Sequence, residues 1–122
     1  MADPAPTKRY LFIINDAPYG NERPYNALRL ALSLSKRSGI TVQVFLTGDG
    51  VLCSRQGQKT PDGYYNLERM MKALLKCGTV ATCGTCCEAR GLESADKIEG
   101  VLDGNLDIQT DWAAEADQIL VY

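Results

Sequence analysis

The chain has 122 residues, of which 45% are hydrophobic and 23% charged, a composition that predicts one folded domain over residues 1–122 and argues against disorder. The net charge of -2 argues against a nucleic-acid-binding protein, because the basic residues form no continuous stripe. The N-terminal residues lack the pattern of a signal peptide, and no apolar run is long enough to span a membrane, so we expect a cytoplasmic protein.

The first half of the chain predicts two strands separated by a helix. Residues 1–7 are rich in proline and are expected to form a flexible tail. The apolar run Arg9–Ile14 predicts a strand, and a helical pattern follows from Pro24 to Arg37. The apolar residues of this helix cover so broad an arc that we expect it to be buried on most sides. The β-branched run Ile40–Leu46 predicts a strand covered on both faces.

The second half continues the alternation of helices and strands. The segment from Glu93 to Gly100 carries little pattern. In the helix that follows Asn105, we expect Leu106, Ile108 and Trp112 to face inward. The predicted elements are, in chain order, a short helix or turn at Val51–Ser54, a helix at Tyr64–Cys77, a strand at Thr79–Thr82, a short helix capped by Asn105, and a strand at Gln118–Tyr122.

Strands that alternate with helices predict an α/β fold with an open, mostly parallel sheet and helices on both faces. In such sheets, ligands bind at the carboxyl ends of the strands. These ends are expected at Asn15 and Asp16, at Thr47–Asp49 and at Thr82–Gly84. The candidate site is therefore the edge of the sheet where these three segments meet.

The chain has five cysteines and no histidine. An odd number of cysteines in a cytoplasmic protein argues against a scaffold of disulfides. The absence of histidine excludes a histidine general base within the chain and any zinc site that contains histidine. Chemistry at the expected site would have to use thiols, carboxylates and backbone dipoles.

Three of the cysteines lie within the stretch "TVATCGTCCEARGL", from Thr79 to Leu92. Cys83 is expected at the end of a strand, with Gly84 and Thr85 turning into a helix whose free N–H groups favour a thiolate. Cys83 is therefore a candidate nucleophile. Cys86, three residues on, is near enough to reach the same sulfur, so this pair can in principle attack and resolve, while Cys87 is expected to face elsewhere.

The stretches "GQKTPDGYYNLERM", "CGTCCEARGL" and "DWAAEADQILVY" resemble the DsrE/DsrF-like family, which includes YchN-type and TusD-type sulfur-relay proteins. This resemblance covers nearly the whole chain in the same order and spacing. It implies a flavodoxin-like α/β subunit with a five-stranded sheet, which assembles into homotrimers or homohexamers. It also implies a cysteine that carries sulfur as a persulfide, which Cys83 matches, and Cys86 matches the second cysteine of the C-G-T-C form.

Our first hypothesis is a sulfur carrier or sulfurtransferase in which Cys83 accepts a sulfane sulfur and passes it to a partner protein. Donor and acceptor proteins are then the expected partners, and persulfide exchange needs no metal or organic cofactor. A second hypothesis is an oligomeric module that binds a small ligand without catalysis. The third is a C-x-x-C thiol oxidoreductase that uses a reversible Cys83–Cys86 bond.

Other candidate residues have both functional and structural explanations. Asn15 and Asp16 could bind a polar substrate beside Cys83 or could serve only the turn. Arg90 could pair with an anionic sulfur species, with a carboxylate of a neighbouring subunit, or with solvent. Cys77 is expected to be a small buried residue. For Cys53 and Cys87, the sequence favours neither packing in the core nor a functional role over the other. A zinc site would need Cys83, Cys86 and further thiols.

Overall fold

The computed structural model describes residues 7–122, so the tail predicted for residues 1–7 lies, apart from Thr7, outside the described residues. All strand pairings of the sheet are parallel, and the strand order is β4-β3-β2-β1-β5. The strands are β1 (Lys8–Ile14), β2 (Ile40–Leu46), β3 (Thr79–Cys83), β4 (Leu102–Gly104) and β5 (Gln118–Val121). The helices are α1 (Arg23–Ser35), α2 (Leu67–Leu75), α3 (Gly84–Ala89) and α4 (Leu106–Glu115), with 3-10 helices η1 (Gly48–Ser54) and η2 (Ser94–Asp96).

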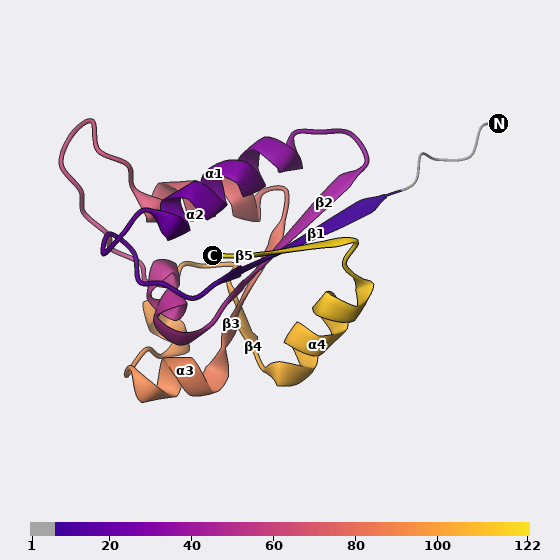
Figure 1. Cartoon of the computed structure of the whole chain (residues 1–122). Helices are drawn as coiled ribbons and strands as arrows, with labels where there is room; N and C mark the ends of the chain where they lie inside the picture. The colour runs from indigo at the N-terminus through magenta and orange to yellow at the C-terminus, as the bar shows by residue number, and fades with distance from the viewer. Residues whose placement is uncertain (1–6) are drawn as a thin grey trace.

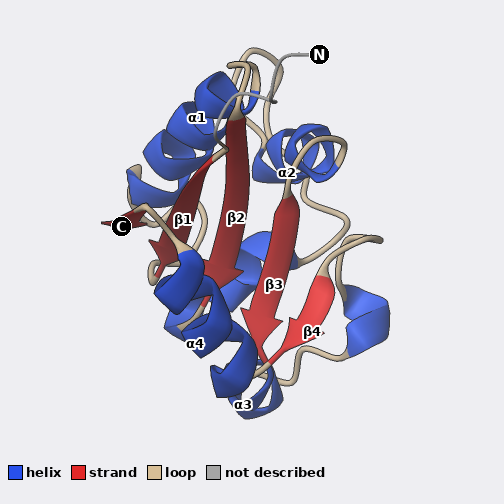
Figure 2. Ribbon diagram, turned by 90° about the vertical axis from the view of Figure 1, so that its right-hand side faces the viewer, coloured by secondary structure: helices blue, strands red, loops and turns tan. Residues whose placement is uncertain are grey.

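Helices cover both faces of the sheet, as predicted. Figure 1 shows α1 and α2 on one side of the strands and α4 on the other, and Figure 2 shows α4 lying across the front of the sheet. The short helices η1 and α3 lie beyond the carboxyl ends of β2 and β3 and contact each other. The carboxyl edge of the sheet is therefore built from two short segments rather than from the long helices.

The larger part of the core lies between the sheet and helices α1 and α2. It contains Phe12, Val44, Leu28 and Met71, all with no exposed surface. Burial of such side chains contributes about 1.5–3 kcal/mol each. The core therefore fixes β1, β2 and α1 firmly behind the carboxyl edge.

The opposite face of the sheet has a smaller core. Leu11, Phe45 and Ala81 are buried there, and Ile108 and Trp112 of α4 pack on them, with the rings of Trp112 and Phe45 edge to face at 6.3 Å. The prediction for Leu106 was wrong, because this residue is 73% exposed at the start of α4. Asn105 caps this helix as predicted, its side chain accepting a hydrogen bond from the Ile108 N–H.

Two helices differ from their predictions. The first, α1, is buried along a single face, at Pro24, Ala27, Leu28 and Ala31, while Leu30 is 38% exposed. Its broad apolar arc therefore did not mean burial on most sides. Helix α2 begins at Leu67 instead of Tyr64, because the Asn66 side chain caps it by accepting a hydrogen bond from the Arg69 N–H.

Strand β4 was the one strand of the sheet described for residues 7–122 that residue patterns did not predict. It has only three residues, and it pairs with the last three of β3, so that Gly104 lies opposite Cys83. No helix formed by residues 7–122 has the length and apolar character needed to cross a membrane.

A cysteine pair at the carboxyl edge of the sheet

Cys83 is the last residue of β3 and occupies the N-cap position of α3, where its side chain makes no capping hydrogen bond. The parallel strands end together here, so the Cys83 side chain is half-buried at the rim rather than inside the sheet. It lines a pocket of about 460 Å³. The other lining residues come from α3, from the end of β4 and from α4, namely Gly84, Thr85, Glu88, Gly104, Asn105, Leu106 and Gln109. A small substrate can therefore reach the Cys83 thiol from solvent.

Hydrogen bonds stabilise the thiolate of Cys83. The Thr85 hydroxyl lies 3.3 Å from the Cys83 sulfur. Partial burial by itself raises the pKa of Cys83, but hydrogen bonds from the Cys86 and Thr85 side chains and from their backbone N–H groups outweigh it and lower the pKa. A cysteine with a lowered pKa is more nucleophilic at neutral pH, because the thiolate is the attacking species.

The sulfur of Cys86 lies against η1. The backbone N–H of Gly48 donates a hydrogen bond to Cys86 Sγ at 3.2 Å, and the Thr47 hydroxyl lies 3.7 Å from the same atom. Gly48 has a φ of +55°, a left-handed conformation that favours glycine. The turn after β2 therefore presents an N–H and a hydroxyl to a sulfur that follows β3.

Arg90 links η1 to α3. Its Nε donates to a carboxylate oxygen of Asp49 at 3.0 Å, and its terminal nitrogen donates to the Cys86 carbonyl at 3.0 Å. Both bonds lie within the chain, and they hold a side chain that is 30% exposed. It holds the turn at Gly48 close to Cys86.

Asn15 and Asp16 lie at the same edge, but at a different pocket. Strand β2 separates β1 from β3, and these residues line a pocket with Arg23, Val121 and Tyr122. Asn15 donates to the Tyr122 carbonyl at 3.0 Å, and Asp16 accepts from Asn21 and Arg23. Within residues 7–122, the chain therefore brings Cys83, Gly84 and Thr85 together and keeps Asn15 and Asp16 apart from them.

The remaining cysteines differ in exposure. Cys53 is fully buried, and burial raises its pKa to about 12, so this thiol is inert at neutral pH. The prediction for Cys77 was wrong: it is exposed, because it follows the end of α2. Cys87 is buried. Across the described part of the chain, no three side chains of His, Cys, Asp or Glu gather as a metal site would require.

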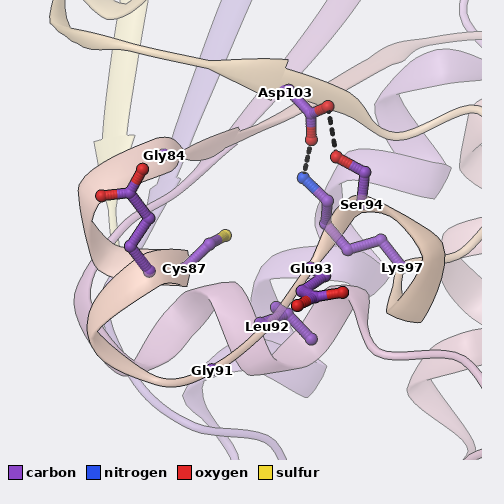
Figure 3. A pocket seen from close by; sticks show the side chains of 9 residues that line it. Gly84, Cys87, Gly91, Leu92, Glu93, Ser94, Lys97 and Asp103 are labelled. Carbon is purple, nitrogen blue, oxygen red and sulfur yellow. Dashed lines mark hydrogen bonds and ion pairs between the residues drawn. The ribbon is translucent and has the colours of Figure 1, made fainter.

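A second pocket, of about 440 Å³, lies against α3 and shares Gly84 and Glu88 with the Cys83 pocket. Figure 3 shows the Cys87 thiol pointing into it and the Lys97 ammonium and Ser94 hydroxyl converging on Asp103. Lys97 also donates to the Thr82 hydroxyl at 3.0 Å, directly before Cys83. No local pattern pointed to this group, since Lys97 and Ser94 lie in a stretch without hydrophobic periodicity.

The comparisons with known proteins agree on one family. The profile described as the DsrE/DsrF-like family matches residues 8–122. Protein YchN of Escherichia coli strain K12 is 34% identical over 117 residues, which cover 94% of this chain and 99% of YchN. An uncharacterized protein of Methanopyrus kandleri is 38% identical over 111 residues, 90% of each chain.

Solved structures give the same result for the fold. The crystal structure of the Escherichia coli YchN protein matches with a TM-score of 0.89 over 95% of this chain and all of the other. A protein of unknown function from Methanobacterium thermoautotrophicum matches with a TM-score of 0.72 at 15% identity over 94% of this chain and 99% of the other. This second likeness shows the fold alone.

Proposed function

The chain belongs to the DsrE/DsrF-like family, a family generally related to sulfur relay, and on this premise we propose that it is a sulfur-handling protein. Cys83 accepts a sulfane sulfur as the persulfide Cys83-S-SH and passes it to a cysteine of a partner protein. The thiolate attacks the sulfane sulfur of a donor, and the donor's thiolate or sulfite leaves with the electron pair of the broken bond. Thiolate exchange of this kind needs neither metal nor organic cofactor.

The observation that carries the proposal is the position and state of the Cys83 thiol. It faces a pocket of about 460 Å³ at the carboxyl edge, and its pKa is lowered by Cys86 and Thr85. A protein that only bound a ligand in this pocket would not need an accessible thiolate there. The pocket has room for the donor or acceptor cysteine to approach.

The proposal includes assembly into homotrimers or homohexamers. The edge strand β5 and the start of α4 leave large apolar side chains exposed: Ile119 at 44%, Val121 at 65% and Leu106 at 73%. An exposed edge strand with apolar side chains is typical of a surface that pairs with another chain. Leu106 also lines the Cys83 pocket, so assembly or partner docking at this surface would border the site.

The proposal also includes a cytoplasmic location. All five cysteines are free thiols, which suits the reducing cytoplasm.

Intact mass spectrometry tests the proposal. Reduced protein is incubated with thiosulfate and a catalytic amount of a sulfurtransferase, and the mass is compared among the wild type, Cys83→Ser, Cys86→Ser and Cys77→Ser. We expect a gain of about 32 Da, one sulfur atom, that needs Cys83 and is seen most clearly in Cys86→Ser. Cys77→Ser is the matched control, because it removes an exposed thiol just before β3, at the opposite end of that strand from Cys83.

The outcomes separate the three functions that the sequence allowed. No sulfur adduct in any variant would reject sulfur transfer and favour the ligand-binding module. An adduct on Cys77 alone would show nonspecific loading of an exposed thiol. A Cys83–Cys86 disulfide that cycles with a dithiol buffer, without any sulfur uptake, would favour the thiol oxidoreductase.

A further inference from the structure

The sulfur of Cys86 lies against two polar groups of the turn that follows β2. The Gly48 N–H donates to its sulfur at 3.2 Å, and the Thr47 hydroxyl lies 3.7 Å away. Cys86 lies in the first turn of α3, three residues after Cys83, and it is among the groups that lower the pKa of Cys83. Cys86 is therefore a neighbour of the proposed sulfur carrier along the helix and accepts a hydrogen bond at its own sulfur from the turn after β2.

We propose that Cys86 is a second reacting group and that the pair converts the sulfane sulfur of Cys83-S-SH into hydrosulfide. This inference rests on the proposed function, since it starts from the persulfide of Cys83. It adds an activity to sulfur relay, because the protein would release sulfide where no acceptor takes the sulfur.

The step is an internal thiol exchange. The Cys86 thiolate attacks Cys83 Sγ, the inner sulfur of the persulfide, and a Cys83–Cys86 bond forms as the Cys83–sulfane bond breaks. The electron pair leaves with the outer sulfur as hydrosulfide, and the proton of the Cys86 thiol goes to solvent. The Cys86 sulfur is oxidised and the sulfane sulfur is reduced to sulfide. A further cycle needs a dithiol to reduce the disulfide.

The positions of the two cysteines favour this reaction. Cys83 stands at the N-cap of α3 and Cys86 in its first turn, so the two side chains are neighbours whose Cβ atoms, about 5–6 Å apart in a regular turn, must close to about 3.5–4.5 Å in the disulfide. In the resting protein, Cys86 is one of the groups that lower the pKa of Cys83. Once Cys83 carries the second sulfur, its Sγ is no longer charged, and the Gly48 N–H and Thr47 hydroxyl remain to stabilise a Cys86 thiolate.

The pocket bears on which sulfur is attacked. Cys83 lines the pocket of about 460 Å³ together with Asn105 and Leu106, whereas Cys86 is not among its lining residues and has its sulfur against Gly48. In the proposed reaction, the outer sulfur occupies this pocket and Cys86 attacks the inner sulfur from outside it. The pocket then gives hydrosulfide a way out to solvent.

Sulfide release and intact mass, measured together on the reduced full-length protein, test the inference with thiosulfate and a catalytic sulfurtransferase as the probe. For the wild type we expect about one sulfide per chain and a mass about 2 Da below the reduced protein. Cys86→Ser should keep the adduct of about 32 Da and lose at least about tenfold in sulfide release. Cys87→Ser is the adjacent matched control and should behave as the wild type.

A pair of variants at Thr47 separates chemistry from folding. Thr47→Val removes the hydroxyl and should slow sulfide release about threefold to tenfold with unchanged loading of Cys83, whereas Thr47→Ser should retain the wild-type rate. An adduct that stays on Cys83 of the wild type without sulfide, or that moves to Cys86, would overturn the inference and leave the proposed function intact. Failure of Cys86→Ser to take up any sulfur would instead reject the proposed function.

Discussion

Arg90 and Asp49 are 41 residues apart in the sequence, yet the Arg90 Nε lies 3.0 Å from an Asp49 carboxylate oxygen. Asp49 follows Gly48, whose N–H is bonded to Cys86, and Arg90 also donates to the Cys86 carbonyl. The ion pair thus closes a small ring of contacts between η1 and α3 around Cys86. Since the two side chains are 30% and 63% exposed, the ion pair contributes little to the free energy of unfolding, and its main effect is to hold Gly48 against Cys86.

We expect Arg90→Gln to lower the free energy of unfolding by less than about 1 kcal/mol, as for other exposed ion pairs. Sulfide release from the Cys83 persulfide should fall about threefold to tenfold, because Gly48 is no longer held against Cys86. Rate measurements and urea unfolding check these values. Arg9→Gln is the matched control: it removes an exposed ion pair, with Glu115, that is equally short but lies at the amino end of the sheet. Equal loss of rate in both variants would argue against the positioning role.

The pH dependence of Cys83 should follow its hydrogen bonds. Since the pKa of Cys83 is lowered, its alkylation by iodoacetamide should persist to a lower pH than that of a free cysteine. Thr85→Val removes one donor and should move the midpoint upward, whereas Thr85→Ser keeps the hydroxyl and should leave it unchanged. Peptide mass spectrometry at a series of pH values locates the modified cysteine, and an unmoved midpoint in Thr85→Val would contradict the assignment.

Removal of Asp103 should cost more stability than removal of its partner. Asp103→Ala leaves the Lys97 ammonium, on a side chain only 4% exposed, without a counter-charge, and we expect a loss of about 2–3 kcal/mol. Lys97→Met leaves Asp103, 60% exposed, able to take water in its place, so the loss should be about 1 kcal/mol. Urea unfolding at neutral pH compares the two, and the reverse order would contradict this account.

The pH dependence of the same pair has a definite sign. Lys97 and Ser94 lower the pKa of Asp103, so its stabilising contribution is present above the pKa of an unfolded aspartate, about 4. That contribution is lost as the pH falls through the lowered pKa of the folded state. The difference in stability between the wild type and Asp103→Ala should therefore shrink on acidification below about pH 4.

Gly50 tests the packing of η1 on β1. A Cβ atom at this position would lie 2.0 Å from the Ile14 carbonyl oxygen, which is backbone and cannot move aside cheaply. Gly50→Ala should destabilise the protein by about 1–3 kcal/mol or more and displace the turn that holds Cys86. Gly20→Ala has no atom within 4 Å of the added methyl group and should be near neutral in thermal unfolding.

The exposed edge strand predicts assembly. We expect the wild type to run as a trimer or hexamer in size exclusion with light scattering, and Val121→Glu to shift it toward smaller species. A charge on an edge strand opposes pairing with another chain. Because Val121 is 65% exposed, the fold of the single chain should be retained, which circular dichroism checks. A monomeric wild type would reject this part of the proposal.

The sequence allowed four of the five strands to be placed from local patterns. The runs that became β1, β2, β3 and β5 are rich in apolar and β-branched residues, since each pairs with at least one neighbouring strand. Strand β4 was not predicted, because its three residues, Leu102–Gly104, are too few to show a periodicity. Only their pairing with Ala81–Cys83 makes them a strand. Local pattern also could not show that Leu30 and Leu106 stay exposed, because burial depends on what covers each helix.

Part of the candidate site was also predictable from local sequence patterns. Cys83 follows from its place at the end of a strand, and Cys86 from its spacing to Cys83. The contact of Cys86 with Gly48, and that of Lys97 with Thr82, depend on the tertiary fold and have no sequence signal of their own. The sheet order, which puts β2 between β1 and β3, likewise separates Asn15 from Cys83 in a way that no local pattern could show.

The parallel pairing of β1 with β5 also bears on how the chain folds during synthesis. Strand β1 pairs with β2, which begins 26 positions after β1 ends, but its other edge is closed only by residues 118–121, more than a hundred positions later. Until the ribosome has released β5, the nascent chain carries an unpaired edge at Tyr10–Ile13, and contacts of such long sequence separation form slowly. Aggregation during expression should therefore depend on how quickly the last strand docks, and chaperones that shield strand edges should raise the yield of folded protein.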